Sequence, residues 1–151
     1  MKLEWATAEH APAMASAHAP AFDRPWDEAT FARMLGETGV YGFVALDGDP
    51  LGVVLCRVIA GEAEVLTLAV PPWARRKGVA KALMAAALGA ARQAGATQAF
   101  LEVDVDNVAA IGLYEGLGFE RAGLRKAYYD RGAAGRADAL VMRLDLAAQG
   151  Q

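Results

Sequence analysis

The chain has 151 residues, of which 55% are hydrophobic and 22% charged, and its formal net charge at pH 7 is −3. A chain of this length and composition has enough apolar side chains for one domain with a single shared core. The slightly acidic balance excludes a general nucleic-acid binder, whose binding face would be strongly basic. The single cysteine, Cys56, excludes a disulfide framework and a cysteine-ligated zinc site.

The N-terminal segment has no pattern typical of export or of metal binding. It contains no continuous apolar core, and no apolar run in the chain reaches the roughly 18 residues that a membrane span needs. We therefore expect a cytoplasmic protein without membrane contact. His10 and His18 share an expected helix that has no other ligand nearby, so we expect solvated or capping roles for them and no metal site.

The first half of the chain predicts one strand, two helices and then a hairpin. Thr7 is typical of a helix cap and Gly36 of a helix stop. The turn Asp47-Gly48-Asp49-Pro50 tolerates positive φ, and apolar β-formers flank it on both sides. In chain order we expect a strand at 3–6, helices at 10–19 and 27–35, and strands at 41–46 and 51–59.

The second half alternates strands with helices. Pro71 and Pro72 end a strand because proline has no N–H for a β-ladder, and Gly95 and Gly118 end helices. In chain order we expect a strand at 62–70, a helix at 79–94, a strand at 98–103, a helix at 107–117 and strands at 119–124 and 139–144, with a Gly- and Arg-rich loop at 128–138.

This order of elements predicts an α/β (α+β) protein with a mixed sheet covered by helices on both faces. Only the unit from 62 to 103 is expected to be parallel, as a right-handed crossover. We expect a single domain over residues 1–147 and a short tail at 148–151.

A short cationic loop leads from the strand at 62–70 into the long helix. A helix start has unpaired N–H groups and partial positive charge, and Gly78 has no Cβ to keep an anion away from the backbone. The loop therefore predicts a pyrophosphate-binding site, with a solvated basic face as the alternative. The cations are Arg75, Arg76, Lys77 and Lys81.

Two ordered motifs resemble those of one enzyme family. The first is Arg75-x-x-Gly78-x-Ala80, directly after Leu68-Ala69-Val70, and the second runs Asn107…Ala109-Ala110…Leu113-Tyr114-Glu115…Leu117-Gly118-Phe119. They resemble the acetyl-CoA motif and a second hallmark of the GCN5-related N-acetyltransferases. The resemblance implies the fold of that family: a mixed, mostly antiparallel sheet of six to seven strands flanked by about four helices, whose central parallel pair splays around acetyl-CoA.

Within that family the chain is similar to the bacterial ribosomal-protein-alanine N-acetyltransferases. The similar segments are Pro25-Trp26, 64–70, Leu101-Glu102-Val103, Tyr128-Tyr129 and Gly135-Arg136-x-Asp138-Ala139. Ala80, Asp104 and the loop at 132–134 depart from the pattern of that group. The resemblance implies acetyl transfer to the N-terminal alanine of a small-subunit ribosomal protein. The alternatives are another amine, such as an antibiotic, a polyamine or a lysine side chain, and a non-catalytic acyl-CoA-binding module.

The same resemblance assigns the residues that bind acetyl-CoA, the one co-substrate expected. Asn107 would hydrogen-bond the pantetheine arm, although it is also typical of a helix N-cap, worth about 1 kcal/mol. The backbone of Leu68, Ala69 and Val70 would pair with the arm as an added strand does, and the N–H near Val70 would polarise the thioester oxygen. The pyrophosphate would lie on Arg75, Arg76, Lys77, Gly78, Val79, Ala80 and Lys81.

Glu102 is the candidate general base. It lies between Leu101 and Val103 in an expected strand, where a carboxylate is costly unless it faces water, a partner or a substrate. Such a carboxylate can deprotonate an amine directly or through one water. The alternative is an ion pair with an arginine such as Arg121 or Arg143.

Tyr114 is the candidate general acid. It lies two helical turns after Asn107, so the two side chains share one helix face. The resemblance places Tyr114 beside the thioester sulfur, where it could protonate the leaving thiolate. With reference pKa values of about 10 and 8.5, this transfer is uphill by about 2 kcal/mol. The alternative is a core aromatic.

The acceptor is expected to be a protein or peptide N-terminus. An α-amine has a lower pKa than a lysine side chain, which makes its neutral form cheaper by roughly 3.5 kcal/mol near pH 7. Trp26, Tyr128 and Tyr129 could line a peptide groove, or they could fill gaps in the core. We expect no direct nucleic-acid partner and a monomer or weak dimer.

Overall fold

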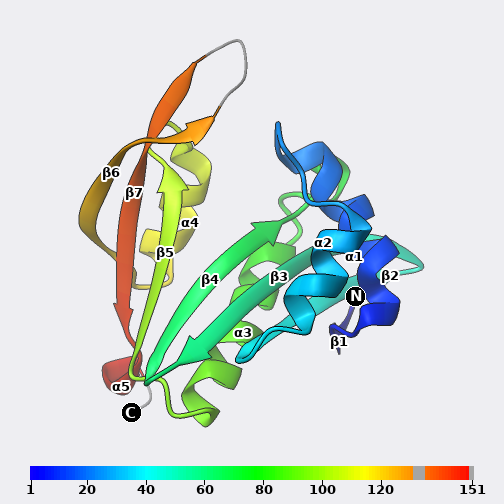
Figure 1. Ribbon diagram of the computed structural model, residues 1–151, viewed down its shortest axis with the longest axis horizontal. Helices are drawn as coiled ribbons and strands as arrows, with labels where there is room; N and C mark the ends of the chain where they lie inside the picture. The colour runs from blue at the N-terminus through cyan, green and yellow to red at the C-terminus, as the bar shows by residue number, and fades with distance from the viewer. Residues whose placement is uncertain (131–134, 150–151) are drawn as a thin grey trace.

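Seven strands form one sheet that runs through the whole molecule (Figure 1). The computed structural model describes residues 1–130 and 135–149, with the backbone alone at 129, 130, 148 and 149. The strands are β1 (Lys2–Trp5), β2 (Val40–Asp47), β3 (Asp49–Ile59), β4 (Glu62–Ala69), β5 (Gln98–Asp104), β6 (Glu120–Asp130) and β7 (Arg136–Asp145). The helices are α1 (Ala11–His18), α2 (Glu28–Leu35), α3 (Val79–Gln93), α4 (Val108–Gly116) and the short α5 (Leu146–Gln149), with 3-10 turns η1 (Ala8–His10), η2 (Ala19–Ala21) and η3 (Pro72–Ala74).

The strand order is β1-β2-β3-β4-β5-β7-β6, and every neighbouring pair is antiparallel except β4 and β5. This confirms the predicted fold class of a mixed, mostly antiparallel sheet. The predicted hairpin is also confirmed, and Gly48 in its turn has a φ of 73°.

The parallel strands β4 and β5 touch only where they begin. Their pairing covers Glu62 to Glu64 of β4 and Gln98 to Phe100 of β5, and the two strands then diverge toward their carboxyl ends (Figure 1). The register of β4 with β3 shifts at Leu66, the extra residue of a bulge, and bulges bend the strand that carries them. The far end of β4 therefore has one edge that β5 does not pair.

Helices cover both faces of the sheet (Figure 1). On one face α1 and α2 enclose a core that includes Met14, Phe31 and Val53. On the other face α3 and α4 enclose a larger core, to which β3 contributes Val54 and α3 contributes Leu83. The successive residues Val53 and Val54 belong to different cores because side chains alternate along a strand. The predicted covering of both faces is confirmed.

The predicted loop at 128–138 is wrong in extent. β6 continues to Asp130 and β7 begins at Arg136, so among the described residues of that range only Gly135 lies outside a strand, and 131–134 are outside the described residues. The cause is a β-bulge in β6 between Arg125 and Tyr129, which contains residues that are typical of loops. Ala127 has a φ of 51°, its N–H donates to Asp138 Oδ1 at 2.8 Å, and its carbonyl accepts from Arg136 Nε at 2.9 Å. Side chains thus replace the ladder hydrogen bonds that the bulge interrupts.

The two histidines have different roles. His10 caps the first turn as predicted, since its Nδ1 accepts from the Thr7 N–H at 3.0 Å. The prediction of a solvated or capping role for His18 is wrong, because this residue is 2% exposed. Its neighbours Ala17 and Met14 are also buried, so α1 turns His18 toward the sheet with them.

Candidate active site

The cationic loop forms a helix start open to solvent. Gly78 is the N-cap of α3 with a φ of 78°, no side chain caps the helix, and Arg76 is also left-handed at 65°. A Cβ at Gly78 would meet no protein atom within 4 Å, so within the protein itself the glycine is needed for its left-handed φ. Two left-handed residues on either side of Lys77 curl the backbone so that the first N–H groups of α3 can face an anion.

The predicted cations of this loop differ in what they contact. Arg75 Nε donates to the Val70 carbonyl at 3.0 Å, which ties the loop to the end of β4. Arg76, Lys77 and Lys81 are exposed. Arg75 therefore shapes the loop, while the other three keep their charges available to a phosphate. The Val70 carbonyl, expected to pair with a pantetheine arm, is already hydrogen-bonded.

Replacing Gly78 with alanine should weaken coenzyme A binding by about 5- to 30-fold, since a left-handed φ costs a residue with a Cβ roughly 1–2 kcal/mol. Isothermal titration calorimetry measures the Kd. Gly61→Ala is the matched control, because Gly61 has a φ of 81° and equally open surroundings in the β3–β4 turn. Equal affinities in Gly78→Ala and the wild type would contradict a backbone-built anion site.

The strand β4 carries the next predicted residues. Leu68 and Ala69 pair with Val54 and Val53 of β3, and their opposite edge faces the region that β5 leaves. Leu68 and Val70 pack against the core that contains Tyr114. The side chains of Leu68, Val70 and Tyr114 thus lie on the same face of the sheet.

The helix α4 presents Asn107 and Tyr114. Asn107 is its N-cap, and its Oδ1 accepts from the Ala110 N–H at 3.2 Å, so the capping role is confirmed while the amide NH₂ can still donate. Tyr114 is 8% exposed and its ring lies 5.9 Å from that of Phe119. Burial raises the pKa of Tyr114 to about 12. Asn107 therefore acts as a helix N-cap and Tyr114 as a core aromatic, and neither structural role prevents a role in binding or catalysis.

Glu102 projects from the opposite face of β5. Its neighbours Leu101 and Val103 are buried in the core under α4, and strand alternation turns Glu102 the other way. The candidate base and the candidate acid thus lie on opposite faces of the sheet. An acceptor amine can be deprotonated from one face while a thiolate is protonated from the other.

Glu102 has an ion-pair partner that the sequence did not single out. Arg125 Nη1 donates to both carboxylate oxygens, at 2.8 and 3.0 Å, and the guanidinium lies 3.8 Å from the centre of the Tyr128 ring. Glu102 thus forms an ion pair with an arginine, as the alternative predicted, but that arginine is Arg125. Arg121, which the alternative named, pairs with Glu115 at 3.4 Å. The Glu102 side chain is 28% exposed, so it remains accessible.

The predicted acceptor residues come from two sides of the molecule. Trp26 is half-buried in the connection between α1 and α2, where its backbone N–H donates to His18 Nδ1. Tyr128 is 42% exposed on β6, beside Arg125 and Glu102. Tyr129 lies opposite Ala137 in the β6–β7 ladder, and its side chain is outside the described residues.

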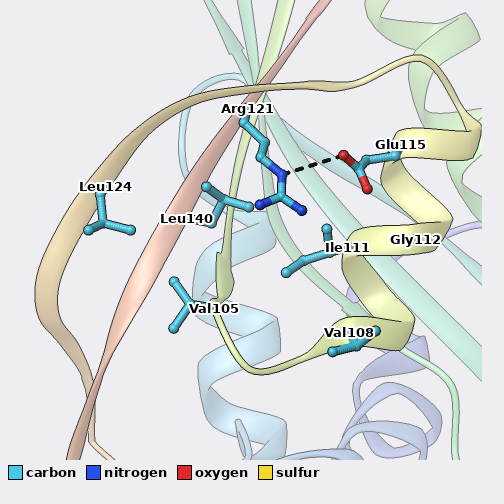
Figure 2. A pocket seen from close by; sticks show the side chains of 8 residues that line it. All are labelled: Val105, Val108, Ile111, Gly112, Glu115, Arg121, Leu124 and Leu140. Carbon is cyan, nitrogen blue, oxygen red and sulfur yellow. Dashed lines mark hydrogen bonds and ion pairs between the residues drawn. The ribbon is translucent and has the colours of Figure 1, made fainter.

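A pocket of about 320 Å³ lies between α4 and the strands β6 and β7 (Figure 2). Its helix residues are on average about a third of a turn around α4 from Tyr114, and none of the predicted site residues lines it. The pocket is therefore separate from the proposed chemistry. Its lining is Val105, Val108, Ile111, Gly112, Glu115, Arg121, Leu124 and Leu140.

Two features are absent from the part of the chain that the structure describes. No helix in it is long and apolar enough to cross a membrane. In residues 1–130 and 135–149, no group of three or more histidine, cysteine, aspartate or glutamate side chains could hold a metal ion.

Comparisons with known proteins identify the family of the chain. Residues 5–119 match the family model described as Acetyltransferase (GNAT) family. The [ribosomal protein bS18]-alanine N-acetyltransferase of Escherichia coli (strain K12) is 35% identical over 122 residues, which cover 81% of this chain and 82% of that protein. The N-alpha-acetyltransferase RimI of Mycobacterium tuberculosis is 37% identical over 128 residues, which cover 82% and 77%.

A solved structure extends the likeness to the fold. The crystal structure of the ribosomal-protein-S18-alanine N-acetyltransferase from Escherichia coli matches with a TM-score of 0.85 and 32% identity, over 96% of this chain and 93% of that one. Enzymes of this family use acetyl-CoA. The family that the two sequence motifs predicted is confirmed: the chain belongs to the GNAT family and is an N-acetyltransferase.

Proposed function

We propose that the protein acetylates a protein N-terminal α-amine with acetyl-CoA, and that its acceptor is the N-terminal alanine of a ribosomal protein of the bS18 type. The placement of Glu102 and Tyr114 on opposite faces of β5, beside the unpaired edge of β4, carries the proposal. The likeness to alanine N-acetyltransferases, at 35% identity, supports the acceptor.

Binding of acetyl-CoA is assigned to the groups around β4 and α3. The first N–H groups of α3, with Arg76, Lys77 and Lys81, hold the diphosphate. The free edge of β4 at Leu68 and Ala69 pairs with the pantetheine arm, as an added strand would. The Asn107 amide donates to the arm, and the Val70 N–H polarises the thioester oxygen.

Direct transfer then needs one base and one acid. Glu102 accepts a proton from the amine, whose nitrogen bonds to the thioester carbon as the C–S bond breaks. Tyr114 gives its proton to the leaving sulfur, and both residues exchange protons with solvent afterwards. Trp26, Tyr128 and Tyr129 contact the first residues of the acceptor.

Release of free thiol from acetyl-CoA tests the proposal. A peptide that begins with alanine should release thiol, and the same peptide with its α-amine already acetylated should not. A peptide whose only free amine is a lysine side chain should be slower, because its higher pKa makes the neutral amine rarer. Equal signals from the first two peptides would overturn the α-amine assignment. Binding of acetyl-CoA without thiol release for any amine would favour a non-catalytic module.

A further inference from the structure

His18 is a buried imidazole that the proposed chemistry does not use. It is 2% exposed, and both ring nitrogens are hydrogen-bonded. The Trp26 N–H donates to Nδ1 at 3.0 Å, and Nε2 lies 2.8 Å from Thr67 Oγ1. Because Nδ1 accepts, the ring proton is on Nε2 and is donated to Thr67. The ring is neutral, and burial lowers its pKa to about 4.

Aromatic rings pack around this imidazole. Phe22 and Trp26 lie nearly parallel to it, with centroids 4.3 and 5.6 Å away and interplanar angles of 21° and 23°. Phe31 meets it edge-on at 5.4 Å and is fully buried. Phe22, in contrast, is 43% exposed. His18 therefore fixes the orientation of an exposed ring and a half-buried ring on the connection between α1 and α2.

The hydrogen bond of His18 Nε2 reaches β4, the strand along which the pantetheine arm is proposed to lie. Thr67 belongs to β4, directly before Leu68, in the part of the strand that β5 does not pair. The connection between α1 and α2 lies beside the carboxyl end of β4 (Figure 1), and Trp26 packs against the same core as Ala69. Two hydrogen bonds through one rigid ring thus join the Trp26 backbone to β4.

We propose that His18 is a positioning residue for the acceptor, which holds Phe22 and Trp26 as one wall of the acceptor site and fixes that wall to β4 through Thr67. The assignment of Trp26 to the acceptor side rests on the proposed function. Phe22 thereby becomes a second aromatic contact for the peptide. A wall held in place before binding loses less conformational freedom when the peptide arrives, which favours acceptor affinity.

The Thr67→Val variant tests the bridge, since valine keeps the shape of threonine and removes the hydroxyl. The KM for the acceptor should rise by about fivefold to tenfold, because a buried N–H then lacks its partner and the wall is free to shift. The kcat and the KM for acetyl-CoA should not change. Thr67→Ser keeps a hydroxyl and should restore the wild-type acceptor KM.

The Tyr41→Phe variant is the control for a general loss of stability. The Tyr41 hydroxyl donates to the Ala87 carbonyl at 2.6 Å, and Tyr41 packs against the core on the opposite face of the sheet. Its removal should lower the free energy of unfolding and leave the acceptor KM unchanged. If His18 only stabilises the fold, Thr67→Val will behave in the same way, and the proposal is wrong.

Hydrogen exchange at the Trp26 amide gives a second readout that needs no turnover. The amide should exchange faster in Thr67→Val than in the wild type or Thr67→Ser, and equal rates would overturn the proposal. A wild-type protein that acetylates lysine side chains but not α-amines would contradict the proposed function alone. The KM comparison would then be made with the lysine acceptor, and the role of His18 would still be tested.

Discussion

Replacing Glu102 with glutamine should lower kcat by about 100-fold or more, because general base catalysis typically contributes 10²- to 10⁴-fold. Glutamine keeps the size of the side chain and cannot accept the amine proton. The affinity for coenzyme A should remain that of the wild type, since Glu102 faces away from the core that Leu68 and Tyr114 share. Steady-state thiol release and calorimetry measure the two quantities separately.

Two control variants separate this role from that of an ion pair. Arg125→Met breaks the pair with Glu102 and leaves the carboxylate in place, so its loss of kcat should be much smaller. Glu64→Gln removes a strand carboxylate that pairs with Arg57 at 3.4 Å, and its kcat should be unchanged. If Arg125→Met and Glu102→Gln lose the same activity, Glu102 acts only through its ion pair and is not the base.

Replacing Tyr114 with phenylalanine should lower kcat by about 100-fold or more, because the thiolate then leaves without a proton donor. The buried Tyr114, with a pKa of about 12, would be about 3.5 units above a thiol in water, or about 5 kcal/mol uphill. Burial raises the pKa of a thiol in the same site as well, because both charged forms lose hydration. Within the site, the difference between the pKa of Tyr114 and that of the thiol is therefore smaller than the difference calculated for a thiol in water.

The raised pKa also predicts a pH dependence. A phenol with a pKa of about 12 stays protonated throughout the working range of the enzyme, so kcat should not fall between neutral pH and about pH 10 through loss of the acid. The Tyr41→Phe variant, which alters another buried tyrosine, should keep its kcat. A kcat for Tyr114→Phe equal to that of the wild type would remove Tyr114 from the mechanism.

Much of the fold could be predicted from local signals in the sequence. Gly48 in the hairpin turn and Gly78 at the start of α3 need a positive φ, and the chain has glycine at both places. The proline pair after β4 and the glycine after α4 mark ends that depend on single residues. Such signals act within a few residues, so one chain is enough to read them.

The predictions that are wrong concern contacts between residues far apart in the sequence. The partner of Glu102 is 23 residues away, and it depends on register shifts in β6 that composition does not reveal. His18 is 49 residues from Thr67, and its burial follows from how α1 lies on the sheet. The β6–β7 hairpin was missed in part because Asp138 and Arg136 stabilise a bulge at Ala127 that reads as a loop in the sequence.

The short contact between β4 and β5 means that the hydrogen-bonded sheet is nearly divided in two, although one core lies under both parts. In the sheet, three residue pairs of the β4–β5 ladder join four strands, β1 to β4, to the other three, β5 to β7. A pantetheine chain lying along β4 and touching Asn107 would bridge these two parts and take the place of the missing ladder. The substrate would then serve as part of the architecture, and the protein would lose an internal brace each time it discharged coenzyme A.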